Sequence, residues 1–260
     1  MTSIALEGIR LSKNFGGLNA IENVSFAVRA GSLSALIGPN GAGKTTLFNM
    51  VTNVFPASSG EIWFFGKNLA RLAPHQIAVS GLIRTFQSAR VFPGMTALEN
   101  VIAGAYIHLR SNILSQMLWS ARSRREERRL VAKAEALLDM VGLAAFRDVA
   151  ATELPMGGQK LLEIMRALMA KPRMLLLDEP AAGLNDSETA ELAALLVAIR
   201  DSGVTILVVE HNMSLVMGIA DDVIVMDAGT IMTSGAPSEI QRDPRVIEAY
   251  IGGKSGVTHA

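Results

Sequence analysis

The sequence contains no cysteine. Disulfide frameworks, thiolate zinc sites, iron–sulfur clusters and cysteine nucleophiles are therefore excluded. Aromatic residues make up only 5% of the chain and charged residues only 18%, whereas half of all residues are hydrophobic. This composition excludes the class of disordered chains, in which low hydrophobicity accompanies high charge.

An excess of charge of either sign is also lacking, because 24 basic residues balance 24 acidic ones. No overall field would attract nucleic acid or an anionic membrane. The sequence also lacks the run of about 18 apolar residues that a membrane-spanning helix needs. Its first residues, 1–7, show no basic start followed by an apolar stretch, as a secretory signal would. We expect a cytoplasmic protein that reaches a membrane only through a partner.

Short β-type runs alternate with helical patterns, which is typical of an α/β domain with a mainly parallel sheet. Three apolar runs predict strands that are buried on both faces, at residues 33–37, 174–177 and 205–209. An acidic first turn and a following glycine predict a helix over residues 186–201. Apolar and polar residues alternate more clearly near the N-terminus, over residues 4–10 and 20–28, and this pattern predicts an antiparallel accessory sheet.

The pattern changes between about residues 88 and 170, where helical stretches replace β-branched runs. These stretches cover residues 96–108, residues 123–141 and a segment after Gly157. We therefore predict a single domain over 1–260, with an α/β core formed by 1–87 and 171–260. A helical subdomain over 88–170 would be inserted between a strand near residues 82–86 and the strand at 174.

A phosphate-binding loop is the strongest local pattern, because residues 38–45 match G-x-x-x-x-G-K-[ST] between a buried strand and a helix. Glycines let the backbone wrap around oxygen atoms, and the amides of residues 41–45 would point at phosphates from a helix N-terminus. Lys44 would reach the β- and γ-phosphates, and Thr45 would offer its hydroxyl to Mg²⁺. A glycine-rich turn with a surface lysine is the alternative interpretation. The predicted loop consists of Gly38, Pro39, Asn40, Gly41, Ala42, Gly43, Lys44, Thr45 and Thr46.

Two carboxylates follow the apolar run at 174–177. Asp178 would hold the metal through its hydration shell, as the acidic partner of a phosphate loop does. Glu179 is placed to polarise a water in line with the γ-phosphate, acting as a general base. An ordinary acidic turn after a strand is the alternative, but the phosphate loop favours the catalytic interpretation.

With these motifs, the chain resembles an ATP-binding cassette (ABC) protein over almost its whole length. The resemblance implies a RecA-like P-loop NTPase fold that binds ATP and Mg²⁺. Gln87 resembles the family's glutamine that contacts metal and water, and His211 resembles the switch histidine that contacts the γ-phosphate. Phe15 occupies the place of the aromatic that stacks on adenine, and residues 181–185 occupy that of the D-loop. A structural histidine and a core phenylalanine are the alternative interpretations.

The family's signature, L-S-G-G-Q at the start of a helix, is matched imperfectly and in two possible registers. Anchoring on residues 157–159 requires a one-residue deletion in the following helix, which would rotate later side chains by about 100°. Anchoring on Leu154 requires no deletion, and we prefer this register. In this register proline replaces serine and glycine replaces glutamine, so two side-chain donors are missing. We expect the proline to lie in the first turn of the helix. The backbone N–H groups at the helix start would then recognise phosphate. The signature residues are then Leu154, Pro155, Met156, Gly157 and Gly158.

Segments 84–92, 154–158, 178–185 and 210–218, with the tail 235–251, resemble the ATP-binding subunits of bacterial branched-chain amino-acid uptake systems. The resemblance implies an ATPase on the cytoplasmic face of the inner membrane. Its partners would be a second, non-identical ATPase subunit, two membrane permeases and, indirectly, a periplasmic binding protein. Gly158 and Leu161 depart from the subfamily pattern. Related systems import urea or short amides, so the cargo stays open.

In the implied mechanism, two cassettes clamp two ATP molecules, and each signature completes the site of the other chain. The permeases would sense closure through residues 87–96, where Val91, Phe92 and Met95 pack against a cytoplasmic helix. Burial of these side chains within the helical subdomain is the alternative.

Two other functional classes compete with this interpretation. A soluble cassette ATPase that acts on nucleic acid or ribosomes predicts a second cassette, a coiled-coil insertion or a basic face. The arginines between 122 and 129 are interrupted by Glu126 and Glu127, so we interpret them as a solvated helix face. A phosphate-loop kinase or GTPase fits poorly, because Glu179 and His211 suit attack by water.

Overall fold

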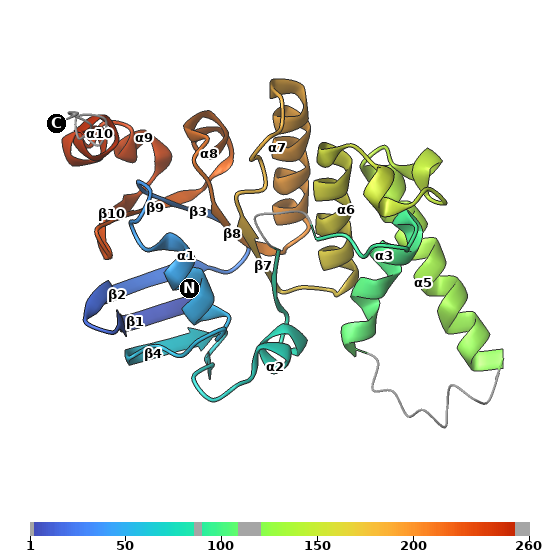
Figure 1. Ribbon diagram of the computed structural model, residues 1–260, viewed down its shortest axis with the longest axis horizontal. Helices are drawn as coiled ribbons and strands as arrows, with labels where there is room; N and C mark the ends of the chain where they lie inside the picture. Colours follow the sequence, from blue (N-terminus) through green and yellow to red (C-terminus); the bar gives the residue numbers. More distant parts are fainter. Residues whose placement is uncertain (1–2, 86–89, 109–120, 253–260) are drawn as a thin grey trace.

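The computed structural model describes residues 3–85, 90–108 and 121–252. Two β-sheets organise its α/β part (Figure 1). The six-stranded sheet has the order β10-β9-β3-β8-β7-β6, and only β10 runs antiparallel to its neighbour. Its strands are β3 (Leu33–Ile37), β6 (Leu82–Arg84), β7 (Met174–Asp178), β8 (Thr205–Val209), β9 (Asp222–Asp227) and β10 (Thr230–Gly235).

The second sheet is antiparallel, in the order β2-β1-β4-β5, as the N-terminal alternation predicted. Its strands are β1 (Ile4–Phe15), β2 (Leu18–Arg29), β4 (Ser59–Phe64) and β5 (Lys67–Asn68). Both long strands exceed the predicted runs, because register shifts between them interrupt the alternation of buried and exposed residues.

Helix α1 (Lys44–Val51) joins the two sheets. Its buried side chains, among them Leu47 and Phe48, belong to one apolar cluster with residues of β1, β2 and β4 and with one face of the large sheet. The opposite face of the large sheet is covered by α7 (Asp186–Asp201), α8 (Met213–Ile219) and α9 (Pro237–Ile240), and α10 (Pro244–Gly252) lies beside α9 (Figure 1). The central strands therefore have no polar face, which explains their continuous apolar sequence.

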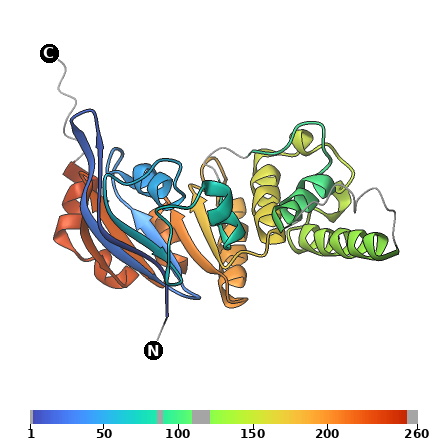
Figure 2. The same cartoon turned by 90° about the horizontal axis from the view of Figure 1, so that it is seen from below.

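The remaining helices lie mostly at one end of the molecule, between β6 and β7 in the chain (Figure 2). The predicted helix over 96–108 is observed as α3 (Ala97–Ala103) followed by the 3-10 segment η1 (Gly104–His108). The other helical elements are α2 (Pro74–Val79), α5 (Ala121–Met140), η2 (Ala144–Phe146), η3 (Ala151–Glu153) and α6 (Met156–Met169). Within the described residues, none of the helices has both the length and the apolar character needed to cross a lipid bilayer.

Candidate nucleotide site

The predicted phosphate-binding loop links the end of β3 to the start of α1. Gly38 has a φ of 152°, and a Cβ atom there would collide with the carbonyl of Met226 on β9. Gly43 has a φ of 97°, and a Cβ atom would lie 2.8 Å from the carbonyl oxygen of Ala20. Glycine is therefore required at both positions, by left-handed backbone conformation and by close approach of other strands.

Lys44 is the first residue of α1 and is only 6% exposed. Its Nζ donates hydrogen bonds to the carbonyl oxygens of Gly38, at 2.7 Å, and of Pro39, at 3.0 Å. Burial lowers the pKa of Lys44, while the negative charges of Glu179 and Asp178 act in the opposite direction. A cation is thus held inside the loop that would surround a phosphate chain.

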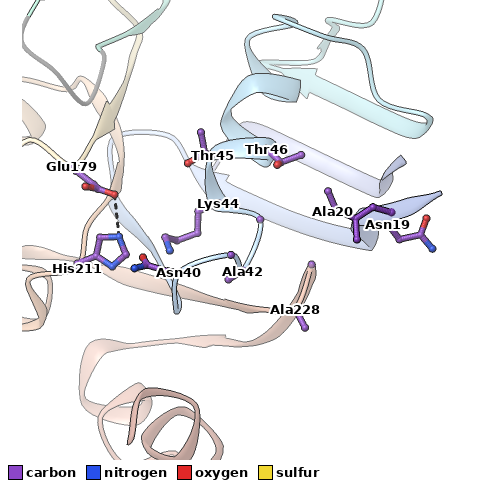
Figure 3. A pocket seen from close by; sticks show the side chains of 14 residues that line it. Asn19, Ala20, Asn40, Ala42, Lys44, Thr45, Thr46, Glu179, His211 and Ala228 are labelled. Carbon is purple, nitrogen blue, oxygen red and sulfur yellow. Dashed lines mark hydrogen bonds and ion pairs between the residues drawn. The ribbon is translucent and has the colours of Figure 1, made fainter. Parts of the chain in front are cut away.

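The loop forms the floor of a pocket of about 460 Å³. Glu179 and His211 lie at one end of this pocket, and Asn19 and Ala228 lie at the other (Figure 3). No atom lies within 4 Å of the Cβ position at Gly41, so its backbone is open to a ligand. The pocket is lined by Leu18, Asn19, Ala20, Asn40, Gly41, Ala42, Gly43, Lys44, Thr45, Thr46, Glu179, His211, Ala228 and Gly229.

Asp178 ends β7 and is 5% exposed. Its Oδ2 accepts a hydrogen bond of 2.8 Å from the Nη2 of Arg84, the last residue of β6. The Nη1 of Arg84 donates to the side-chain oxygen of Asn49 on α1, at 2.6 Å. Arg84 therefore links Asp178, the carboxylate that the sequence predicts near the metal, to α1, the helix that follows the phosphate-binding loop.

Glu179 has a left-handed backbone, with a φ of 48°, which is uncommon for a residue with a side chain. Its amide donates to the carbonyl of Val209 on β8, at 2.9 Å. Its Oε1 lies 3.0 Å from the Nε2 of His211, which follows β8 (Figure 3). The two predicted catalytic side chains are therefore in hydrogen-bond contact, which is the arrangement of a base held by an orienting partner.

Other predicted residues lie apart from this pocket. The signature residues 154–158 do not line it, and the structure makes Pro155 the N-cap of α6, one residue before the helix begins rather than within its first turn. Phe15 does not line it either, and its ring meets that of Phe55 edge-on at 5.2 Å. Its adenine contact stays a prediction. Gln87 lies outside the described residues.

Several pocket residues were not anticipated from the sequence. Leu18, Asn19 and Ala20 open β2, and Ala228 with Gly229 forms the turn between β9 and β10. These segments lie far apart in the chain and carry no phosphate-binding pattern. The glycine-containing turns next to these two segments are the signal in the sequence that could have identified them, because tight turns place the backbone close to a ligand.

An ABC transporter family model matches residues 21–182. The chain belongs to the ABC transporter family. A second model, described as a branched-chain amino acid ATP-binding cassette transporter, matches residues 230–255. Members of this family are ATPases coupled to transport, so the chain is an ATPase of this kind and binds a nucleotide.

Curated relatives of this ABC protein cover nearly its whole length. It is 42% identical over 253 residues to the high-affinity branched-chain amino acid transport ATP-binding protein BraF of Pseudomonas aeruginosa, covering 97% of this chain and 99% of the relative. It is 41% identical over 250 residues to the high-affinity branched-chain amino acid transport ATP-binding protein LivG of Salmonella typhimurium, covering 96% of this chain and 97% of the relative.

Solved ABC structures confirm the fold. A nucleotide-free ATP-binding cassette from an ABC transporter has a TM-score of 0.82 and 33% sequence identity, and the match covers 96% of this chain and 99% of that one. The ADP conformation of a cassette also has a TM-score of 0.82, with 31% identity, and the match covers 96% of this chain and 100% of that one. The predicted α/β P-loop NTPase architecture is therefore confirmed.

Proposed function

We propose that this chain is the ATP-hydrolysing subunit of an importer for branched-chain amino acids. The observation that carries the proposal is the pocket in which a phosphate-binding loop faces the paired Glu179 and His211. The names of the relatives and the match at residues 230–255 support the cargo. Importers of urea or short amides remain the alternative cargo class.

The residues of the pocket fit a nucleotide with Mg²⁺. Lys44 and the exposed backbone of Gly41 suit phosphate oxygens, and the Thr45 hydroxyl is an oxygen donor of the kind Mg²⁺ prefers. Asp178 does not line the pocket but ends β7 directly before Glu179, so we propose that it would act on the metal through the metal's hydration shell. When bound, the metal would offset negative charge on the β- and γ-phosphates. Gln87 would complete the metal contacts, as the sequence resemblance implies.

In the hydrolysis that we propose, each side chain has one role. Lys44 and the loop amides bind and orient the phosphate chain. Glu179 orients the attacking water and accepts its proton, and His211 holds the Glu179 carboxylate through their 3.0 Å contact while facing the γ-phosphate. Phe15 would stack on the adenine ring.

The signature residues 154–158 would complete the nucleotide site of a second, non-identical cassette. Pro155 and Met156 are exposed at the start of α6, so the N-terminus of this helix is available to a partner. The Gln159 side chain donates back to the carbonyl of Leu154, at 2.8 Å. This contact supports the register anchored on Leu154, since the Gln159 amide is engaged within its own chain.

Restoring the missing serine should act on the partner cassette. Pro155→Ser adds one hydroxyl donor at the helix start, and a hydrogen bond to a charged group contributes about 1.5–3 kcal/mol. We expect ATP to bind about 10- to 100-fold more tightly at the site completed by this signature, and to change less than 2-fold in affinity at the site formed by Lys44. Site-specific nucleotide occupancy in the mixed dimer measures both, and equal changes at the two sites would contradict the assignment.

We propose that membrane permeases dock on residues 90–96, the described segment directly before α3. Phe92 and Met95 are 45% and 40% exposed, as docking requires, whereas Val91 is partly buried against the core, as the alternative interpretation predicted. Asn100, fully buried, accepts from the amide of Phe92 and donates to the carbonyl of Thr96. This side chain therefore holds residues 92–96 in one conformation, which a cytoplasmic helix could recognise.

The domain division and the location of the protein are further parts of the proposal. Residues 88–170 would act as the inserted helical subdomain between core segments 1–87 and 171–260. The assembled cassette pair would sit on the cytoplasmic face of the inner membrane, held there by two permeases and served indirectly by a periplasmic binding protein. No nucleic acid partner is proposed.

Loss of the Lys44 ammonium should abolish this function. Lys44→Ala removes a charged donor of phosphate contacts, so MgATP affinity in calorimetry should fall at least about 10-fold. A strain that lacks the chromosomal copy should regain leucine uptake with the intact chain but not with the variant. Lys67→Ala, on the exposed strand β5, is the control and should match the intact chain.

The uptake measurement also separates the alternatives. Recovery of urea or amide uptake without leucine uptake would replace the proposed cargo. If no permease subunit co-purifies with the intact chain from membranes, the soluble class of cassette ATPase would be favoured instead.

A further inference from the structure

Lys160 is a buried lysine in α6 that the proposed reaction does not use. It lies four residues after Met156, where the helix begins, and is only 8% exposed. Its Nζ donates to the carbonyl oxygens of Glu179, at 3.4 Å, of Pro180, at 3.1 Å, and of Ala182. One side chain thus connects the signature helix to the loop that carries Glu179.

A buried carboxylate also binds the same loop. Glu210 is 3% exposed, and its Oε1 accepts a hydrogen bond of 2.7 Å from the amide of Ala181. Its Oε2 accepts a hydrogen bond of 3.1 Å from the amide of His211. The loop over residues 179–182 is therefore held between a cation on α6 and an anion next to His211.

Burial of this ammonium is costly unless polar groups compensate it. Burial lowers the pKa of Lys160, and the negative charges of Glu210, Glu179 and Glu163 counteract that effect. The three carbonyl oxygens saturate its three N–H donors, so its contacts are directional. They act on a loop whose first residue, Glu179, has an unfavourable left-handed backbone that its surroundings must maintain.

We propose that Lys160 is a positioning residue that couples the orientation of α6 to the placement of the Glu179 carboxylate. The inference rests on the proposed role of Glu179 as the base. A shift of α6 displaces the Nζ and, with it, the carbonyls of the loop that begins at Glu179. The signature helix thereby sets the geometry for hydrolysis in its own chain, in addition to any contact with a partner.

The matched variants are Lys160→Met, which keeps the length but removes all donors, and Lys160→Arg, which keeps charge and donors. In the assembled transporter we expect Lys160→Met to lower kcat for ATP hydrolysis about 10- to 100-fold, because small displacements of a catalytic group have effects of that size. The KM and the Kd for MgATP should change less than 2-fold. Lys160→Arg should recover most of the rate, and Lys67→Met should have no effect.

A second readout does not depend on turnover. Hydrogen exchange of the peptide that spans residues 179–185 should be faster in Lys160→Met, whereas exchange of the phosphate-binding loop at 38–46 should stay unchanged. A general loss of structure would accelerate both. If Lys160→Met fails to fold, Lys160→Gln, which keeps one donor group, is measured against the same criteria.

Three results would overturn the inference. They are an unchanged kcat in Lys160→Met, a parallel loss of rate and MgATP affinity, or equal rates in the Met and Arg variants. Failure of the role proposed for Glu179 gives a different result, because Glu179→Gln would then hydrolyse ATP at the normal rate.

Discussion

Glu179→Gln should retain ATP binding and lose turnover. Glutamine has nearly the same shape and can still contact His211, but it cannot accept a proton from the attacking water. Loss of a general base lowers rates by about 10²- to 10⁴-fold. We expect a decrease of that size in kcat, with the Kd for MgATP changed less than 2-fold, as measured by steady-state hydrolysis and calorimetry.

Glu191→Gln is the matched control, because Glu191 is exposed on α7 and lies outside the pocket. Its rate should equal that of the unchanged chain. Hydrolysis at the normal rate in Glu179→Gln would remove Glu179 from its proposed role, and the contact with His211 would then be structural only.

Arg84→Met should destabilise the fold strongly. The side chains of Arg84 and Asp178 are 10% and 7% exposed, and their ion pair is 2.8 Å long. Removing one partner of a buried ion pair leaves an uncompensated charge and costs about 3–5 kcal/mol. The free energy of unfolding from denaturant titration should fall by about that amount, with the slope against denaturant unchanged.

An exposed pair provides the control for this effect. Arg147 and Glu135 form an ion pair with side chains 42% and 40% exposed. Exposed pairs contribute little, so Arg147→Met should cost less than about 1 kcal/mol. Adding Asp178→Asn to Arg84→Met should restore part of the lost stability. Equal effects of Arg84→Met and Arg147→Met would show that the buried pair is not electrostatically important.

The central strands and the phosphate-binding loop could be predicted because each depends on adjacent residues. Continuous apolar runs predict strands buried on both faces, and the spacing of glycine and lysine within the loop predicts its ligand. The sequence pattern does not predict strands over residues 222–235, which form β9 and β10. Such a short apolar run does not distinguish a strand from a buried helical turn.

The contacts that complete the site could not be predicted, because they join distant segments. Arg84 on β6 donates a hydrogen bond to Asp178 on the neighbouring strand β7, and Lys160 donates to carbonyl groups 19 to 22 residues later in the chain. A carbonyl acceptor is present at every residue, so no sequence pattern identifies the ones that Lys160 binds. The extent of β1 was missed for a local reason, since Arg10 has a φ of 48° beside a register shift with β2.

The chain leaves the large sheet through β6 for the helices α3 to α6 and returns through β7. These two strands are adjacent and paired, with Leu82 opposite Met174 and Arg84 opposite Leu176. The gap that any insertion must bridge is therefore only the spacing of neighbouring strands, whatever the insertion contains. A helical arm of another size would consequently leave the order of the sheet unchanged, as long as it kept the contacts of Lys160 with the loop at 179–182.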